Sequence, residues 1–434
     1  MQKTVLTKAV AVALATLGAS ATFAQSSLTI YGNLDVALDS VHKGQGDASG
    51  TLYASSPALT AAVTAPSTTT RLTSSISSVN ALGFKGTEDI GGGYKGGFVL
   101  EGQFQVDTGA QSGQDSRMWG RQAFVSLTTP YGEVRLGRQY APMFYAFATA
   151  TVEALGGADI MGSGLIVNNL QVRQDNQVSY WLKAGDLTGA LSYSPNAGVD
   201  QKISSNRGQA AGAANGQIVG GATAGTEAAG TNNRGQSAGL YLNFAVDPAL
   251  MINGSVHVNK FGNAQLVSGT SGTVLANLSA YKAFSLGTKY TMPGSAIQLA
   301  AIFHRGEFKN DDGDAAGPKI NTIALGAKMP INQFAVGAEY AYSKFANFTK
   351  GKDTSLMLMG DYNFSKRTKV YIRAGYAKDS RGEVASTGAG LPIAGGPLPL
   401  LTGLGSLETP FFSGGGANID ATTRVVALGI RHQF

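Results

Sequence analysis

The sequence predicts an all-β protein, a sixteen-stranded antiparallel transmembrane β-barrel with short periplasmic turns and long extracellular loops. Three observations lead to this fold class. Long segments alternate apolar and polar residues, short and long connections alternate between those segments, and glycine supplies 59 of 434 residues while cysteine is absent. Strands that cross a bilayer explain the first observation, their periplasmic turns and extracellular loops explain the second, and many turns explain the high glycine content.

The composition excludes several other classes. Charged residues make up 14 % of the chain and the mean hydropathy is +0.00, which fits neither a disordered polyelectrolyte nor a helical membrane protein. Without cysteine there is no disulfide framework, thiolate zinc site or cysteine nucleophile. Only four histidines are present, so we expect no metal centre and no cofactor.

The N-terminal segment has the pattern of a secretory signal peptide. Lys3 and Lys8 give it a positive start, Ala9–Leu17 is a short apolar stretch, and Ala21–Ala24 has the pattern of a cleavage site. We expect residues 1–24 to be the signal peptide, with cleavage between Ala24 and Gln25, and residues 25–434 to be the barrel. The mature chain then holds 31 basic and 27 acidic residues, a net charge of +4.

The first strand shows the alternation most clearly. From Leu28 to Asp39 the even positions are apolar or glycine, and the odd positions are mostly polar. A period of two indicates a strand with one apolar and one polar face, and twelve residues suffice to cross a bilayer at a tilt. The same pattern recurs to the end of the chain. We expect sixteen strands near residues 27–40, 79–88, 94–107, 118–128, 133–141, 173–183, 186–194, 236–246, 250–260, 278–290, 296–305, 320–329, 334–343, 355–364, 368–378 and 422–434.

The connections sort into two kinds. Every second one is a short turn, such as Thr129–Gly132 or Asp247–Ala249, and the others are mostly long. The long ones span residues 41–78, 108–117, 142–172, 195–235, 261–277, 306–319, 344–354 and 379–421. This alternation is typical of an outer-membrane barrel, whose closed sheet leaves no unpaired backbone group in hydrocarbon. Sixteen strands enclose a lumen wide enough for water.

Eight segments of the chain carry recognisable motifs: Leu28–Asp35 (LTIYGNLD), Leu82–Asp89 (LGFKGTED), Arg121–Val125 (RQAFV), Tyr131–Gln139 (YGEVRLGRQ), Asp175–Tyr180 (DNQVSY), Leu325–Ala327 (LGA), Tyr362–Thr368 (YNFSKRT) and Gly429–Phe434 (GIRHQF). Taken together, these segments resemble the general porins of Gram-negative bacteria, especially the trimeric porins of β-proteobacteria. The resemblance implies a homotrimer in outer-membrane lipid, with the third loop folded into each lumen as a constriction. It also implies that the terminal Phe434 is the signal read by the outer-membrane assembly machinery.

The alternation places six basic residues on the polar, lumenal face: Lys85, Arg135, Arg173, Lys289, Arg373 and Arg431. Two more, Arg121 and Arg138, fall on the apolar face by strict counting. We expect a local shift to turn them inward, because the resemblance implies it and an arginine facing lipid is costly. The third loop, residues 142–172, contributes two acids, Glu153 and Asp159. A basic wall facing an acidic loop creates a field across the pore.

These features favour a non-enzymatic channel for passive diffusion of small hydrophilic solutes and ions, with a weak anion preference. A substrate-specific channel with a defined solute-binding site is the alternative. A barrel hydrolase would need a serine–histidine or aspartate–histidine site near the rim, and the four scattered histidines do not provide one. The glycine-rich Gly91–Gly96 segment fits a phosphate-binding pattern, but it opens a strand rather than a helix, so we expect no phosphate site there. We also expect no nucleic-acid partner.

Overall fold

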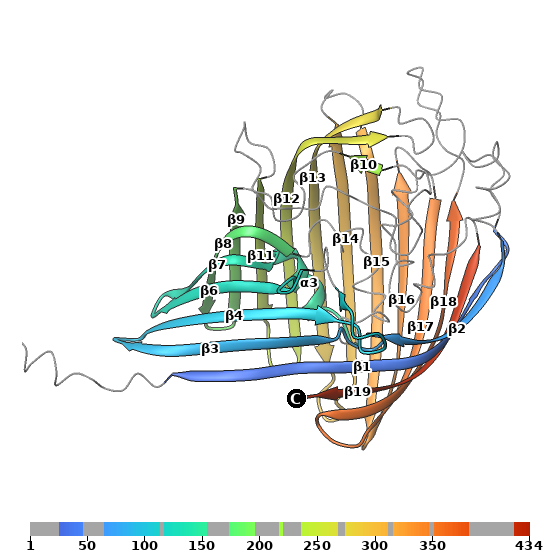
Figure 1. Cartoon of the computed structure of the whole chain (residues 1–434), viewed down its shortest axis with the longest axis horizontal. Coiled ribbons are helices and arrows are strands. Elements are labelled where there is room, and N and C mark those ends of the chain that lie inside the picture. Colours follow the sequence, from blue (N-terminus) through green and yellow to red (C-terminus); the bar gives the residue numbers. More distant parts are fainter. Residues whose placement is uncertain are drawn as a thin grey trace, which may run out of the picture.

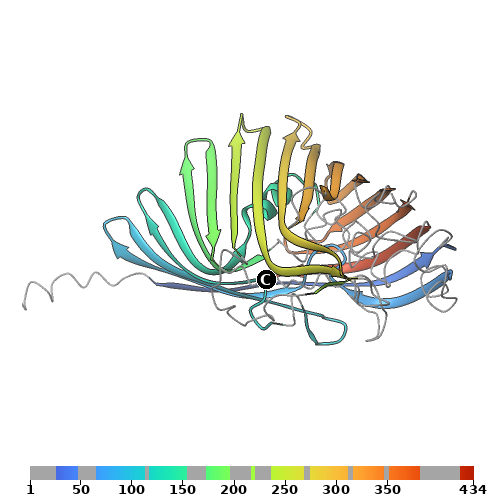
Figure 2. The same ribbon diagram turned by 90° about the horizontal axis from the view of Figure 1, so that it is seen from above.

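The computed structural model describes residues 26–46, 65–112, 117–153, 173–195, 217–219, 236–267, 274–310, 316–346, 351–381 and 421–434. Within these ranges nineteen strands form one antiparallel sheet (Figure 1). The last strand pairs with the first, from Asn33 opposite Gln433 to Lys43 opposite Thr423, so the sheet closes on itself. Seen from above, the strands stand around an arch, and β1 runs along its base between β3 and β19 (Figure 2).

The predicted sixteen-stranded barrel is confirmed. In order around the barrel its strands are β1 (Ser27–Lys43), β3 (Ala81–Gly91), β4 (Tyr94–Phe104), β6 (Gln122–Thr129), β7 (Gly132–Tyr140), β8 (Arg173–Ala184), β9 (Leu187–Ser194), β11 (Ser237–Ala245), β12 (Leu250–Val267), β13 (Val274–Thr291), β14 (Gln298–Asn310), β15 (Ala316–Ile331), β16 (Phe334–Ala346), β17 (Gly351–Asn363), β18 (Thr368–Arg381) and β19 (Thr422–Gln433). Three short strands are additional among the described residues: β2 (Ser67–Ser74), β5 (Gln111–Ser112) and β10 (Gln217–Val219) pair with β1, β4 and β12.

The strands from β12 to β18 extend further toward the long connections than the alternation predicts. For example, β12 continues past the expected end at residue 260 to Val267, and β17 begins at Gly351 rather than near 355. Beyond the bilayer both faces of a strand meet water, so the apolar–polar alternation fades while the hydrogen-bond ladder continues. The expected loops 261–277, 306–319 and 344–354 are therefore too long.

Other expected loops also contain regular structure. The expected loop 41–78 includes β2, which continues the pairing of β1 from Val36 to Lys43. The expected loops 108–117 and 195–235 include the short strands β5 and β10. The third loop begins with helix α3 (Pro142–Thr149), whose first-turn proline needs no hydrogen-bond partner for its nitrogen. These segments lack the two-residue period, so the alternation could not reveal them.

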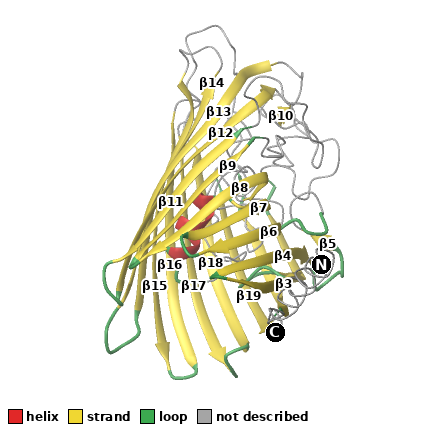
Figure 3. Cartoon of the chain, turned by 90° about the vertical axis from the view of Figure 1, so that its left-hand side faces the viewer, coloured by secondary structure: helices red, strands yellow, loops and turns green. Residues whose placement is uncertain are grey.

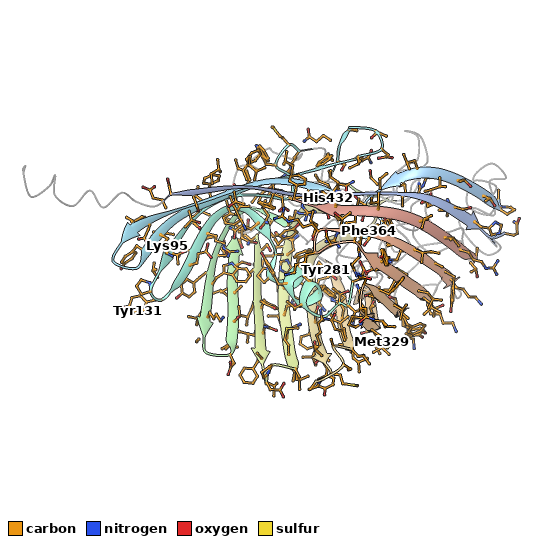
Figure 4. The ribbon with its side chains drawn as sticks, turned by 90° about the horizontal axis from the view of Figure 1, so that it is seen from below. Lys95, Tyr131, Tyr281, Met329, Phe364 and His432 are labelled. Carbon is orange, nitrogen blue, oxygen red and sulfur yellow. The ribbon has the colours of Figure 1, made fainter. Side chains whose placement is uncertain are left out.

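The two faces of the wall differ as predicted. Outward side chains are large and apolar, such as Leu325, 50 % exposed, and Leu428, 63 % exposed. Inward side chains are mostly small, polar or charged. Tyr281, which is fully buried, points into the barrel beside α3, whereas Tyr131, 78 % exposed, lies at the outer edge (Figure 4). No helix within the described ranges has the length and apolar character to cross a bilayer.

The end of the chain completes the closure. The backbone N–H of Gly32 donates to the carbonyl of Phe434 at 3.1 Å, and the N–H of Phe434 donates back to the carbonyl of Gly32 at 3.1 Å. A Cβ atom at Gly32 would lie 2.4 Å from the Phe434 ring and 2.6 Å from the Ala81 carbonyl oxygen. Glycine is therefore needed where the last residue packs against the first strand.

We predict that Gly32→Ala weakens this closure. The added methyl group would clash with both the Phe434 ring and the Ala81 carbonyl of β3, so both must shift. Such overpacking costs about 1–3 kcal/mol. Urea unfolding of the refolded protein in micelles measures the loss. The control is Gly96→Ala, where a Cβ atom would meet only Ile90, at 3.5 Å. Equal stability of the two variants would contradict this account of the closure.

Candidate pore constriction

Helix α3 lies on the inner side of the wall, against β9, β11, β12 and β13 (Figure 3). Its apolar face, which includes Ala146, packs against Tyr241 and Ala190. At its C-terminal end the Asn253 side chain donates to the Thr149 hydroxyl at 2.7 Å. The next residue, Ala150, approaches the wall at Gly287, where a Cβ atom would lie only 2.7 Å from the Cβ of Ala150. The third loop thus enters the lumen, as the resemblance implies.

The loop continues to Glu153, whose carboxylate is buried among three cations. Arg373 contacts it at 3.0 Å, Lys369 at 3.4 Å and Lys328 at 3.5 Å. The hydroxyl of Ser77 also donates to it at 3.0 Å. Burial alone would raise the pKa of the Glu153 carboxyl, but these three cations hold that pKa well below its usual range. Glu153 is therefore ionised and fixes the loop to the β15–β18 side of the barrel.

A second carboxylate, Asp361 on β17, binds the same three cations. It lies 2.8 Å from Arg373, 3.0 Å from Lys369 and 3.2 Å from Lys328. We call these five residues the Glu153 cluster. Three positive charges meet two negative ones, so the cluster as a whole keeps a positive charge.

Residues 75–80, between β2 and β3, turn into the lumen and meet the Glu153 cluster. Asp35 on β1 holds this inward segment: its carboxylate accepts the backbone N–H groups of Ile76 at 3.1 Å, Ser77 at 3.1 Å and Ser78 at 2.9 Å. The Tyr371 hydroxyl donates to the same carboxylate at 2.6 Å. Asp35 thereby replaces the ladder hydrogen bonds that these backbone groups lose when the strand is interrupted.

On the opposite part of the wall four arginines gather around two carboxylates. Arg121 pairs with Glu101, while Arg117, at 2.7 Å, and Arg138 both pair with Asp175. The fourth, Arg173, donates to the Tyr140 hydroxyl at 3.2 Å and lies over the Tyr140 ring, 4.8 Å from its centre. Among the described residues Arg173 contacts no carboxylate. We call the four arginines with Glu101 and Asp175 the arginine cluster, and its formal charge is positive.

Arg121 and Arg138, which strict alternation places on the apolar face, turn inward for different structural reasons. The β7–β8 pairing shifts register between Gly137 and Gln139, so Arg138 turns inward and its Nε donates to the carbonyl of Gly120 at 2.8 Å. Arg121 lies one residue before β6, after a turn, so the alternation of that strand does not determine the direction of its side chain. The expected local shift is therefore present at Arg138, whereas Arg121 turns inward without a register shift because it precedes the strand.

The other sequence-selected residues do not join either cluster. Arg135 pairs with Glu133 at 2.7 Å and lies over the Trp181 ring, and Arg431 donates to Asn33 at 2.9 Å. Lys85 lies 5.3 Å from the centre of the Tyr31 ring, and Lys289 is half-buried on the inner face of β13. Asp159, Ala24 and Gln25 lie outside the described residues. Within the described part, no group of three or more histidines and acids is arranged to hold a metal ion.

Three acids of the wall are functional residues that the sequence did not single out. Asp35, Glu101 and Asp361 all stand on strands, and Asp35 belongs to the polar face of the first strand that the alternation had already identified. The expected charge pattern placed the cations on the wall and the acids in the third loop. Reading all charges of the polar face together would have found both partners.

Comparisons with known proteins agree with this geometry. A family model described as Gram-negative porin matches residues 9–382. The sequence is 28 % identical to outer membrane porin protein 32 of Delftia acidovorans over 434 residues, covering 98 % of this chain and 99 % of that protein.

Two solved structures have a similar fold. One is described as an anion-selective porin from Comamonas acidovorans, with a TM-score of 0.57, 24 % identity and coverage of 94 % of this chain and 100 % of the other. The second is OmpT of Vibrio cholerae in a trimer form, with a TM-score of 0.58, 14 % identity and coverage of 94 % and 99 %.

We predict that Asp35→Asn loosens the constriction. An amide has one acceptor oxygen fewer than the carboxylate, so backbone N–H groups of the inward segment are left unpaired, which costs about 1–3 kcal/mol. Single-channel recordings should show increased open-channel noise, and urea unfolding in micelles a lower stability. The control is Asp247→Asn, because Asp247 also accepts two backbone N–H groups, but in an exposed turn. Open-channel noise equal to that of the control would contradict this role of Asp35.

Proposed function

The chain belongs to the Gram-negative porin family, and from this premise we propose that it forms a water-filled channel for passive diffusion of small hydrophilic solutes and ions with a weak anion preference. It is an outer-membrane porin and, like its family, a channel rather than an enzyme. The preference is argued from the charge of the two lumenal clusters. The likeness to an anion-selective structure supports only the fold.

The arginine cluster is the observation that carries the anion preference. Four guanidinium groups face two carboxylates, and Arg173 has a tyrosine rather than an acid as its partner. A confined pore focuses such an excess of charge and favours entry of anions. The preference is weak because Glu153 and Asp361 offset part of the positive charge on the other side.

A channel with a defined solute-binding site is the second candidate. The rings of Tyr140, Phe144, Tyr145 and Trp181 form a chain of stacked and edge-on contacts beside the arginines, as a site for flat anions would require. However, Tyr140 is only 5 % exposed, so protein rather than a solute covers much of this chain. The aromatic rings anchor α3 to the wall, which favours diffusion. Saturable flux, or block of the current by low concentrations of one solute, would favour the second candidate instead.

The proposal includes assembly and export. We take residues 1–24 as the signal peptide, cleaved after Ala24, and the functional unit as a homotrimer in outer-membrane lipid. One structurally similar protein, OmpT, is known in a trimer form. Native mass spectrometry of the purified protein tests both the cleavage and the trimer, because it measures the mass of the mature subunit and the mass of the assembly. Planar-bilayer recordings of a trimer should show conductance steps in triplets.

We predict that Arg173→Gln shifts the reversal potential in a KCl gradient toward cation preference. The variant removes a positive charge that no carboxylate contacts among the described residues. The shift should shrink at high salt, because the screening length falls from about 8 Å at 0.15 M to about 3 Å at 1 M.

The matched control is the double variant Glu133→Gln and Arg135→Gln, which removes one charge of each sign from a contacting pair. Its reversal potential should stay close to that of the unmodified protein. If Arg173→Gln shifts the potential no more than this control does, the selective charges lie elsewhere in the channel.

We also propose that the ring of Phe434 is the signal for the assembly machinery. Phe434→Ala keeps the backbone bonds to Gly32 but removes the terminal aromatic side chain. We predict unassembled chain in the periplasm, although the variant refolded in detergent still forms a barrel. The control is Phe364→Ala, which removes an outward aromatic ring, 63 % exposed, from a turn. Normal surface levels of Phe434→Ala would leave Phe434 as an ordinary interfacial residue.

A further inference from the structure

The outer face of the barrel carries a row of basic residues near the long connections. We call this row the basic belt, and it consists of Lys260, Lys282, Arg305, Lys319, Lys344, Lys352, Lys378 and Arg424. Each belt residue shares the outward parity of the apolar residues of its own strand. On β13, for example, Lys282 is followed by the outward Phe284 and Leu286. The belt therefore faces the surroundings of the barrel, not its lumen.

The register places the belt residues next to one another. Lys344 on β16 is directly opposite Lys352 on β17. On the next strand, β18, Lys378 is opposite Thr354, which lies two residues after Lys352 on β17, so Lys352 and Lys378 are diagonal neighbours. Arg424 on β19 is opposite Tyr376, which lies two residues before Lys378 on β18, so Lys378 and Arg424 are also diagonal neighbours. Directly opposite side chains lie about 5 Å apart and diagonal ones about 7–8 Å, so like charges here repel. A row of this kind needs counter-charges.

The protein supplies few of them. Among the described outward positions of β12–β19, the one acid beside the belt is Glu307. It contacts Lys319 at 3.0 Å and Lys309 at 2.6 Å. In the described part of the chain, Lys282, Lys344, Lys352 and Arg424 form no ion pair. The cations of the Glu153 cluster, by contrast, all contact carboxylates of the protein. The belt is exposed and largely uncompensated.

The position of the belt identifies its surroundings. It lies directly beyond the outermost apolar or aromatic outward residues, such as Phe303, Tyr342 and Tyr376. Aromatic residues mark the membrane–water interface, and the long connections mark the extracellular side. Long basic side chains extend from such a position into the headgroup layer. The belt is thus level with the headgroups of the outer leaflet.

The belt also covers only part of the circumference. The outward positions near the long connections on the remaining wall include Leu82 on β3, Tyr193 on β9 and Ala238 on β11, and none of these is charged. The strands β12–β18 are also longer than the barrel strands from β3 to β11, for example 18 residues in β12 against 8 in β9. One side of the barrel is therefore built differently from the rest.

We propose that the basic belt binds the phosphate groups of the glycolipid in the outer leaflet, so that the β12–β19 wall is a lipid-binding surface. Adjacent cations such as Lys344 and Lys352 share one phosphate, and the apolar band below them contacts the acyl chains. Arginine and lysine form charge-assisted hydrogen bonds with phosphate oxygens. The proposal depends on the outer-membrane barrel and its orientation, and does not depend on the ion preference of the pore.

The test uses the full mature protein, refolded in detergent, and bisphosphorylated lipid A as the probe. After size-exclusion chromatography, fatty-acid analysis measures the lipid A that the protein retains. In the belt variant, Lys344, Lys352 and Lys378 are each replaced by Gln, and retention should fall roughly tenfold or more. The control replaces Lys95, Lys366 and Arg367 by Gln, three exposed cations at the turn end of the barrel, and should retain as much as the unmodified protein.

Two further probes identify the ligand chemistry. Dephosphorylated lipid A should be retained by the unmodified protein only at the level of the belt variant. Phosphatidylglycerol, an anionic lipid without the sugar phosphates, should be retained less than bisphosphorylated lipid A. Unchanged retention by the belt variant, equal retention of dephosphorylated lipid A, or equal retention of phosphatidylglycerol would each overturn the proposal. Heat-modifiable migration on gels verifies that every variant is folded.

Discussion

The hydrogen-bond ladder between β1 and β19 is the interaction on which the rest of the structure depends. In hydrocarbon an unpaired backbone N–H or carbonyl costs several kcal/mol, so a sheet with two free edges could not remain in a bilayer. The pairing runs from Asn33 opposite Gln433 to Lys43 opposite Thr423, and Gly32 and Phe434 extend it by two reciprocal bonds. Once this ladder is closed, one face of every strand is committed to lipid and the other to the lumen.

Because the barrel is closed, chain segments inside the lumen depend on lumenal side chains for their hydrogen bonds and ion pairs. A chain segment that enters the lumen leaves the ladder, and its backbone groups then need other partners. Asp35 provides them for the inward segment, and the wall residues Tyr241 and Asn253 hold the C-terminal end of α3. Glu153 ties the loop to β15 and β18 through cations that Asp361 on β17 also binds. Removing one partner from such a buried ionic group is strongly destabilising, so the constriction is held firmly.

Basic residues serve two purposes on the two faces of the same wall. On the inner face they are mostly paired with acids, and the small excess that remains can act on passing ions. On the outer face of β12–β19 they stand in a row with Glu307 as their acid among the described positions. The difference follows from the surroundings, because the lumen must remain open to water and solutes whereas the headgroup layer brings its own phosphates.

The sequence alone determined the strands, their two faces and the alternation of short turns and long loops. A period of two is a local property, visible over a dozen residues such as Leu28–Asp39, so it can be recognised without the tertiary structure. The threonine-rich β2 has no such period, and only its pairing with β1 makes it a strand. Likewise, only the register shift on β7 turns Arg138 inward. The constriction depends on contacts between residues far apart in the chain, since Glu153 meets Lys328 across 175 positions and Arg373 across 220. No local pattern records such contacts, because closing the barrel is what brings these residues together.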